Sequence, residues 1–393
     1  MSIDLDLETE VNKYSEGARF VRADLHLHSY GEGGSYDVED VSMTPQNVVD
    51  TSIKEGLEVI SITDHNSIEN ARIAIDYAKN KKIYIIPGVE VSTINGHLLV
   101  YFPTFEKLKD FIGKLDFDPS AQTYRESIVQ CLDIASKYGG FGIAAHIDVK
   151  KGFEINIQGY PSSKEDIITS ENLLGLEVSI YQNDDWYTTN DLEVNRKRFA
   201  NLRKNKLAQD SDYEIARVIS SDAHKLSDIG KNSSGNKKLL RVKIEQPSFD
   251  AIRIALIDSA ARVRLEDRIK FAPYFVGIKF DGGFLNSQVV RFSKNLTCII
   301  GGRGTGKSTL VESLIAVSGN VAKEKLLDCS VWPDKISLIY KDETGRKQTL
   351  VKEKFNEVVN LTEPNGSTTT SIKSYGQGNT AETIQHSDKD PGI

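Results

Sequence analysis

The sequence predicts an α/β protein in which seven βα units form a barrel and a second αβ segment follows. Between residues 20 and 220, short apolar runs rich in β-branched residues alternate with longer segments of helical period. The runs that predict strands cover residues 20–25, 58–63, 83–91, 97–102, 141–145, 174–180 and 217–220. Repeated βα units of this kind favour a closed sheet of parallel strands.

Helix starts and a polar linker divide the chain further. Capping residues or proline mark three helix starts: Thr44 with Pro45, Asn66 with Glu69, and Asp118 with Pro119. A Gly/Ser/Asn-rich stretch at 225–240 precedes a strand-like LLRVKIEQ and an amphipathic stretch near 248–266. Because single cores usually stop growing near ~250–300 residues, 393 residues predict two domains. We expect an N-terminal extension at 1–18, a first domain at 19–268 and a second at 269–393.

The composition argues against several classes of protein. The net charge is −7 with 27% charged residues, so any nucleic-acid surface must be local. The start MSIDLDLETE is no signal peptide, and no apolar run reaches about 18 residues, which predicts a cytoplasmic protein without a membrane partner. Cys131, Cys298 and Cys329 are too few and too dispersed for a disulfide framework or a thiolate cluster. A metal here needs nitrogen and oxygen ligands.

Six of the seven histidines lie at or next to the ends of predicted strands. They are His26, His28, His65, His97, His146 and His224, accompanied by Glu90 and Asp222. The C-terminal ends of parallel barrel strands converge on one mouth, so these side chains are expected to meet. They suit Zn, Mn or Fe and exceed the need of one metal. Closely spaced metals can share a bridging hydroxide as nucleophile, which predicts hydrolysis of phosphate esters.

The motifs DLHLHS, TDHN, GVEVST, AAHID and SDAH resemble those of the polymerase and histidinol phosphatase (PHP) superfamily, over roughly residues 20–225. The resemblance implies a distorted seven-stranded βα (TIM-like) barrel with up to three metals at the strand C-termini. It also implies roles: His26 and His28 open the site, His65 follows, Glu90 bridges two metals, His97 and His146 serve the third, and Asp222 with His224 close it. Of these, the residues expected to be catalytic are His26, His28, Glu90, Asp222 and His224.

Two motifs depart from the family pattern. The family usually supplies another ligand soon after its first motif, and within GEGGSYD the candidate is Asp37. Ile147 replaces the proline that commonly follows the histidine of the fifth motif, which alters a turn but no ligand. Asp64 and Glu177 are acidic residues at strand ends, and we interpret them as orienting ligand imidazoles.

A phosphate-binding loop is predicted at GGRGTGKST, residues 301–309, which fits G-x-x-x-x-G-K-[ST]. The apolar run LTCII predicts a strand before it, and KSTLVESLIAV predicts a helix after it, so backbone N–H groups can face phosphates. Lys307 would meet the β- and γ-phosphates of ATP, and Ser308 the Mg²⁺. The expected binding residues are Gly301, Gly302, Arg303, Gly304, Thr305, Gly306, Lys307, Ser308 and Thr309.

Residues from GGFL through this loop to SYGQGN resemble the first lobe of an ABC-type ATPase head of SMC and Rad50 proteins. The resemblance implies that Gln377 senses Mg²⁺ and nucleotide, and that complete heads pair into a homo-oligomer. The signature motif and Walker B are not in these 393 residues, so the chain is a fragment or does not hydrolyse ATP alone. The combination resembles bacterial PHP-ATPase fusions, which include a phage-defence protein and point toward DNA.

The segment NRKRFANLRKNK, residues 195–206, holds six basic residues and no acidic one. Leu192, Phe199 and Leu202 would share the buried face of a helix, leaving the basic residues Arg196, Lys197, Arg203 and Lys206 largely solvated. This helix is either an ordinary solvated face or a contact for a phosphate backbone near the barrel mouth.

Three functions fit these residues. The favoured one is a metal-dependent phosphodiesterase, a DNA nuclease regulated by an ATP-binding head. The second is a phosphatase acting on a small phosphomonoester or nucleotide through the same metals. The third is a nucleotide-responsive scaffold in which the barrel only binds, and the complete ligand set argues against it.

Overall fold

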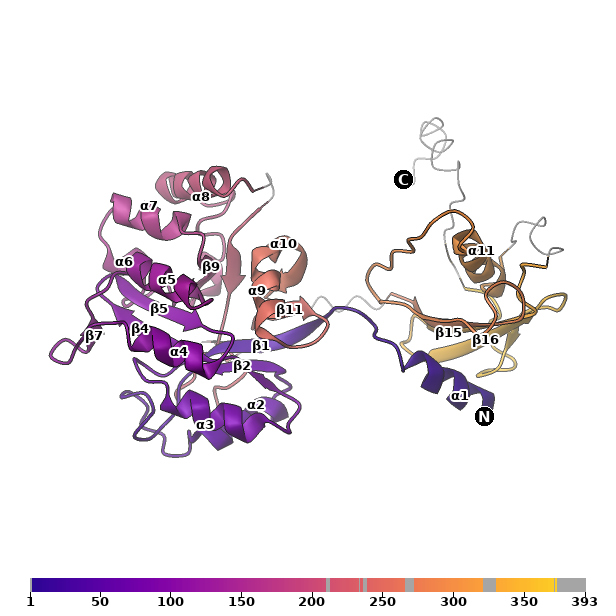
Figure 1. The fold of residues 1–393 in the computed structure, drawn as a ribbon, viewed down its shortest axis with the longest axis horizontal. Helices are drawn as coiled ribbons and strands as arrows, with labels where there is room; N and C mark the ends of the chain where they lie inside the picture. The colour runs from indigo at the N-terminus through magenta and orange to yellow at the C-terminus, as the bar shows by residue number, and fades with distance from the viewer. Residues whose placement is uncertain are drawn as a thin grey trace. The chain divides into compact units, whose positions relative to one another are not determined.

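The chain folds into two compact units of mixed α/β structure (Figure 1). A computed structural model describes residues 2–209, 213–232, 234–235, 239–265, 272–320, 330–370 and 372. One unit comprises Ala18–Arg268, and the other comprises Met1–Gly17 with Ile269–Ile393. None of the helices in the described ranges is both long and apolar enough to cross a membrane.

Two five-stranded sheets form the centre of the described part of the Ala18–Arg268 unit. Their strand orders are β12-β11-β1-β2-β3 and β10-β9-β8-β5-β4. The strands of the first sheet are β1 (Arg19–Leu27), β2 (Val59–Ile62), β3 (Tyr84–Ile85), β11 (Arg241–Ile244) and β12 (Val263–Arg264). Those of the second are β4 (Gly88–Thr93), β5 (Gly96–Tyr101), β8 (Phe141–Ala144), β9 (Leu173–Glu177) and β10 (Ala216–Val218). A small hairpin pairs β6 (Phe117–Asp118) with β7 (Thr123–Tyr124).

Each sheet has a parallel core, and two isolated bridges link the sheets. β1, β2 and β3 run parallel, as do β8, β9 and β10. Parallel bridges join Leu27 to Ala223 on one side and His65 to Glu90 on the other. Both bridges lie where strands end, so the sequence-predicted ligands are brought to one place.

The seven strands predicted between residues 20 and 220 are all present in this unit, but the repeated βα pattern is interrupted. The run at 83–91 splits into β3 and β4 because Pro87 lies between them and has no N–H to donate to a ladder. β4 then pairs with β5 antiparallel, and β5 pairs antiparallel with β8. A tight turn with Gly96 at φ 130° connects β4 to β5, with no crossover helix of the kind that a parallel βα unit needs.

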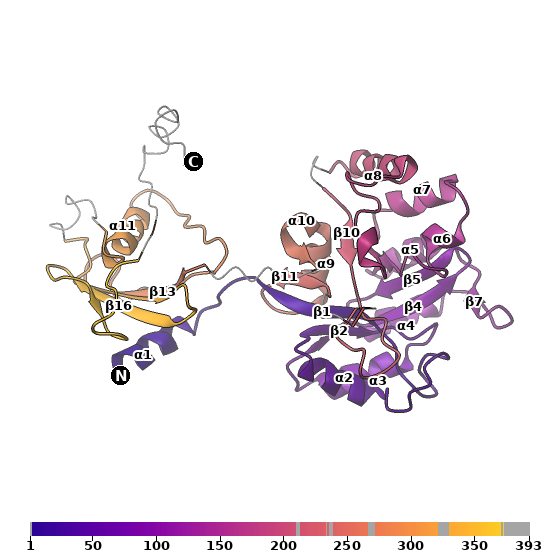
Figure 2. The same cartoon turned by 180° about the vertical axis from the view of Figure 1, so that it is seen from behind.

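Helices pack on the outer faces of the sheets. Figures 1 and 2 show α2 and α3 side by side and α7 beside α8, and α3 also contacts β2 and β3. The helices of this unit are α2 (Pro45–Lys54), α3 (Glu69–Ala78), α4 (Phe105–Ile112), α5 (Ile128–Lys137), α6 (Phe153–Asn156), α7 (Ser162–Thr169), α8 (Val194–Lys206), α9 (Phe249–Ile257) and α10 (Ser259–Arg262), with a 3-10 turn η1 (Tyr181–Asn183).

One of the three predicted helix starts is confirmed and two are wrong. Thr44 Oγ1 accepts a hydrogen bond from Asn47 N at 3.3 Å, with Pro45 opening α2. Asn66 caps nothing, because its Oδ1 accepts from Ser92 N at 2.8 Å, and α3 begins without a side-chain cap. Asp118 ends β6 rather than opening a helix, and the next helix, α5, has a capping box of Ser127 and Gln130 instead.

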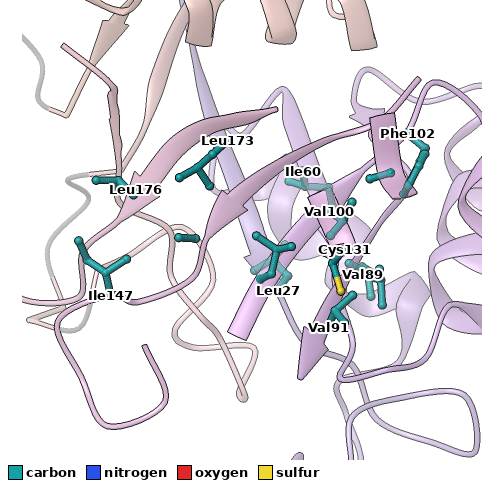
Figure 3. Packing of buried hydrophobic residues seen from close by; sticks show 14 of the residues in the cluster. Leu27, Ile60, Val89, Val91, Val100, Phe102, Cys131, Ile147, Leu173 and Leu176 are labelled. Carbon is teal, nitrogen blue, oxygen red and sulfur yellow. The ribbon is translucent and has the colours of Figure 1, made fainter. Parts of the chain in front are cut away.

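A hydrophobic cluster joins the two sheets beneath the strand ends. Figure 3 shows side chains from both sheets in it, including Leu27 of β1, Val89 of β4, Val100 of β5 and Leu176 of β9. The thiol of Cys131 is buried in the same cluster, and burial raises its pKa to about 12. This core holds the ends of the ligand-bearing strands in a fixed arrangement.

In the second unit, a five-stranded antiparallel sheet of order β14-β13-β15-β16-β17 packs against α11. Its core includes Phe280, Leu310, Trp332 and Leu338. The elements are α1 (Ser2–Val11), β13 (Tyr274–Asp281), β14 (Val289–Arg291), α11 (Lys307–Val317), β15 (Lys335–Lys341), β16 (Lys347–Glu353) and β17 (Val359–Asn360). The N-terminal residues thus pack with the C-terminal sheet, since α1 contacts β13 and β14.

Candidate metal centre

Nine predicted ligands from seven strand ends or adjoining loops come together in the Ala18–Arg268 unit. His26 lies in β1, where the register against β2 shifts between Asp24 and Leu27. Irregularities of this kind re-aim side chains at active sites. His28 follows on the same side, with its Nε2 3.1 Å from Nε2 of His26.

Glu90 of β4 lies at the centre of the cluster and is fully buried. Its carboxylate oxygens face imidazole nitrogens from five histidines: His97 Nδ1 at 2.7 Å, His146 Nε2 at 3.0 Å, His65 Nδ1 at 3.0 Å, His26 Nε2 at 3.1 Å and His28 Nε2 at 3.4 Å. The carboxylate of Glu90 is thus the common partner of five of the predicted ligands.

Two other carboxylates lie on the open side of the cluster. Asp222 Oδ1 is 2.9 Å from Nε2 of His28. Asp37 Oδ2 is 3.2 Å from Nε2 of His65 and 3.4 Å from Nε2 of His224. The side chains of Asp37, Asp222 and His224 are partly exposed, whereas those of His26, His28 and Glu90 are buried. A substrate can therefore reach the cluster from this side.

Other buried polar side chains hold the imidazoles in place. Glu177 Oε2 lies 2.9 Å from Nδ1 of His26 and accepts from His146 N at 3.0 Å. Asp64 orients His28 indirectly, through Ser35. Its carboxylate accepts a hydrogen bond from Ser35 Oγ at 3.0 Å, and this hydroxyl lies 2.6 Å from Nδ1 of His28. Partners of this kind set the tautomer and orientation of ligand imidazoles.

Two ligands have strained backbones that neighbouring hydrogen bonds maintain. Asp222 has φ 50° and its N–H donates to the carbonyl of His26 at 3.0 Å. His146 has φ 27°, and the next residue, Ile147, donates its N–H to the carbonyl of Glu177 at 2.8 Å. A proline at 147 could not make this bond, so the isoleucine changes how the turn is held.

The charges of the cluster result from competition between burial and ion pairing. Burial would raise the pKa of Glu90, but the facing histidines, His26 foremost, hold it well below its usual range. Burial lowers the pKa of His28 to about 4. For His65, hydrogen bonds to Asp37 and Glu90 outweigh burial and raise the pKa to about 10. Near neutral pH the cluster thus contains both neutral and protonated imidazoles.

The donor set fits divalent metal ions. The Nδ1 atoms of His26 and His28 lie against Glu177 and Ser35, so when both carry protons, both Nε2 lone pairs point into the same space. A cation held by His26 and His28 would relieve that repulsion. Ligand atoms within 4.8 Å of one another form three overlapping groups: His28, His65 and His224; His26, His28 and Asp222; His65, Glu90 and His97. Nitrogen and oxygen ligands in overlapping groups match more than one metal of the Zn, Mn or Fe type.

Sequence reasoning missed the importance of Ser35 and the purpose of the glycines before it. The carbonyl of Ser29 would lie 2.2 Å from a Cβ placed at Gly34, so only glycine permits this close approach. The approach lets Ser35 N donate to that carbonyl at 2.9 Å and places its hydroxyl against His28. A glycine pair directly before a serine was the signal available in the sequence.

The interpretation of the basic segment is wrong in part. Arg203 is only 2% exposed, and its guanidinium donates at 2.7 Å to the carbonyls of Ile168, Ser170 and Leu173. Arg196 pairs with Asp191 at 2.8 Å. These side chains are not largely solvated, because Arg203 binds the end of α7, the start of β9 and the residues between them, and Arg196 binds the loop before α8.

The hydrophobic face of this helix also differs from the prediction. Leu192 is 98% exposed and precedes α8, whereas Phe199 is buried. Amphipathic spacing placed Leu192 on the buried face, but the helix begins only at Val194.

The predicted phosphate loop lies in the second unit, before α11. Gly306 has φ 87° at the N-terminus of α11, and Lys307 Nζ donates to the carbonyl of Gly301 at 2.7 Å. Residues Phe284, Gly304, Thr305, Gly306, Lys307, Ser308, Thr309 and Val331 line a hollow of about 270 Å³. Gln377 lies outside the described residues.

The strand predicted before this loop is not formed. Residues 296–300 adopt no strand, and Ile300 is 89% exposed. A strand requires a neighbour to satisfy its backbone N–H and C=O groups, and none of the described strands pairs with this segment.

The chain is similar in sequence or in structure to several known proteins. The chain is 29% identical over 86 residues to the uncharacterized protein MJ1587 of Methanocaldococcus jannaschii, covering 21% of this chain and 50% of that protein. It is similar in structure to the lesion-specific endonuclease PfuEndoQ of Pyrococcus furiosus, with a TM-score of 0.46, 16% identity, and coverage of 67% of this chain and 62% of that one. A two-domain protein of Bacteroides vulgatus containing a predicted PHP-like metal-dependent phosphoesterase has a TM-score of 0.41 and 13% identity, over 86% and 96% of the chains.

The chain spans about half the length of the curated relative and less than two thirds of the endonuclease. The sequence model of the PHP domain family matches residues 24–228, which is more than half of the chain and contains all nine ligands of the cluster. The family resemblance drawn from the five motifs is thereby confirmed, and the chain belongs to the PHP domain family.

Proposed function

We propose that the Ala18–Arg268 unit is a metal-dependent phosphoesterase that hydrolyses phosphodiester bonds in DNA. The observation that carries the proposal is the convergence of six imidazoles and three carboxylates. Seven of these side chains form overlapping ligand groups, and the other two, His146 and Asp37, contact members of those groups. Metals held in such groups, when bound, supply a water of lowered pKa and neutralise charge on the attacked phosphate. The partly exposed side of the cluster, at Asp37, Asp222 and His224, supports access by an extended strand.

The protein's own residues position and protect the ligands. Glu177 and Ser35 orient His26 and His28 through their Nδ1 atoms, which leaves each Nε2 free to bind. Glu90 is held as a carboxylate by the histidines around it. The buried side of the cluster excludes water, so the electrostatic attraction of its carboxylates for cations is stronger than it would be in solvent.

The experiment that tests this function compares substrates. Metal-loaded protein is incubated with single-stranded DNA, duplex DNA, RNA, AMP, an aryl phosphodiester and an aryl phosphomonoester. We expect DNA and the aryl diester to be cleaved faster than either monoester. Turnover of the monoesters alone would establish a small-molecule phosphatase instead, and no turnover with Zn, Mn or Fe would leave a binding scaffold.

We expect two to three divalent metals per chain after reconstitution, because nine ligands exceed the four to six positions of one ion. Since His65 is protonated near neutral pH without metal, loading should also release protons. Elemental analysis and titration in weak buffer measure the two quantities. A single metal, or none, would contradict the shared-ligand arrangement around Glu90.

We also propose that the second unit binds ATP with Mg²⁺ through residues 301–309 and that nucleotide regulates hydrolysis in the first unit. The supporting features are the positive φ of Gly306, the N-terminus of the eleven-residue α11 and the hollow beside it.

Replacing Lys307 by alanine should weaken ATP binding by at least about tenfold, since a charge-assisted contact to phosphate contributes about 1.5–3 kcal/mol. Isothermal titration with ATP and Mg²⁺ measures the change. Lys294→Ala, at an exposed lysine before the loop, is the matched control and should leave affinity unchanged. Equal affinity in the wild type and the Lys307→Ala variant would refute the phosphate-loop assignment.

A further inference from the structure

An exposed tyrosine stacks on one of the metal-ligand imidazoles. The ring of Tyr36 lies on that of His65, with centroids 5.0 Å apart and planes inclined by 26°. The residue is 61% exposed, so much of its side chain is in contact with solvent although the ring stacks on His65. Neither burial nor core packing explains its position.

The backbone on both sides of Tyr36 is held by the cluster itself. Ser35 donates its N–H to the carbonyl of Ser29, and the Asp37 carboxylate contacts His65 and His224. The ring is therefore presented at a defined place although its surface is in water. A platform of this kind loses little conformational entropy when a ligand stacks on it.

A lysine from a separate loop accompanies the ring. Lys151 Nζ donates to Tyr36 Oη at 3.1 Å and lies 5.6 Å from the ring centroid. Its backbone is fixed, because His97 N donates to the Lys151 carbonyl at 3.0 Å, and that carbonyl would lie 2.8 Å from a Cβ on Gly96. Lys151 forms no salt bridge with any carboxylate of the described residues, so its ammonium is available to an anion.

We propose that Tyr36 and Lys151 form a substrate clamp for single-stranded DNA, in which the face of Tyr36 away from His65 stacks on the base beside the scissile phosphate and Lys151 binds an adjoining phosphate. This inference rests on the proposed hydrolysis of DNA. Stacking on aromatic rings combined with cationic contacts to phosphates is how proteins bind unpaired strands without reading their sequence. Because one face of the ring already lies on His65, a base on the other face is one ring's thickness from the metal ligands.

The test measures the affinity of two protein forms for two oligonucleotides, so that the effect of changing the protein can be compared with the effect of changing the substrate. Binding of a fluorescent single-stranded oligonucleotide with cleavage-resistant phosphorothioate linkages is measured by anisotropy, for the full metal-loaded chain and for Tyr36→Ala. The same is done with an oligonucleotide lacking one base at the position beside the preferred cleavage site. We expect the Tyr36→Ala variant to bind the intact strand roughly 5- to 100-fold more weakly. Removing the base should weaken binding by the wild type, but it should hardly change the affinity of the Tyr36→Ala variant, which no longer has a ring for the base to stack on.

Companion variants separate the two contacts. Tyr36→Phe keeps the ring and should bind nearly as well as the wild type. Lys151→Gln should weaken binding and make log affinity less steep in log salt by about 0.7, as one phosphate contact to a single strand requires. The matched controls are Tyr77→Ala and Lys81→Gln, because these residues are also a tyrosine and a lysine in contact. Tyr77 lies in α3, and Nζ of Lys81, just after this helix, is 4.2 Å from the centroid of its ring. These two should change neither affinity nor salt dependence.

The outcomes distinguish this inference from the proposed function. If the wild type cleaves DNA but the Tyr36→Ala and Tyr77→Ala variants bind single-stranded DNA equally well, the clamp is refuted, whereas the proposed phosphodiesterase function is not. If Tyr36→Ala instead loses metal and turnover of a small aryl diester, Tyr36 only supports His65, and the clamp is also refuted. Absence of any diester cleavage by the loaded wild type overturns the proposed function. Absence of single-strand binding overturns the clamp whatever the turnover.

Discussion

Glu90→Gln should lower kcat/KM for an aryl phosphodiester by at least about 10³-fold. The carboxylate contacts imidazoles from five histidines and is fully buried, so its charge is central to the affinity of the cluster for cations. Lewis-acid stabilisation by the metals is worth several kcal/mol of the barrier, and each ~1.4 kcal/mol is a factor of ten in rate. Steady-state kinetics with parallel metal analysis measure the effect.

The neutral amide should also reduce the number of metals bound, because glutamine keeps the shape of Glu90 but not its charge. The matched control is Glu69→Gln, at an exposed glutamate of α3 away from the cluster, which should retain full activity. Undiminished turnover by Glu90→Gln would show that the shared carboxylate is a structural group and that hydrolysis occurs elsewhere.

Arg203→Met should decrease the free energy of unfolding of the first unit by about 3 kcal/mol or more. The substitution leaves the carbonyls of Ile168, Ser170 and Leu173 without their common donor, and hydrogen bonds to a charged group contribute about 1.5–3 kcal/mol each. Methionine keeps much of the side-chain volume, so the loss reports hydrogen bonding more than packing. Urea unfolding followed by circular dichroism measures it.

Arg198→Met is the matched control for this effect. Arg198 is exposed on the same helix, so its replacement should change stability by no more than about 0.5 kcal/mol. Because Arg203 is buried, a loss of DNA binding in an Arg203 variant would be attributed to unfolding unless the variant is shown to remain folded. If Arg203→Met is as stable as the control, the buried guanidinium is not what joins α8 to the preceding loops.

The sequence determined a large part of the candidate site. Imidazoles and carboxylates at strand ends are local features. A short stretch of sequence shows both the residue type of a possible ligand and its position next to an apolar run that predicts a strand. The motifs around His26, His65 and His224 therefore predicted the family, and the model match over residues 24–228 confirmed it. Thr44 with Pro45 is likewise local, because a capping hydroxyl bonds a backbone N–H three residues away.

Other features depended on which groups meet in space, and only the tertiary structure decided them. Asn66 carries the pattern of a cap but bonds to Ser92 across the strands, and Arg203 has the spacing of a solvated cation but meets three carbonyls of another segment. Tyr36 lies on His65 because glycine allows the chain before it to turn closely. Sequence patterns specify local conformation and chemistry. Pairing between distant segments is chosen by the packing of the whole unit, where alternative partners compete for the same polar groups.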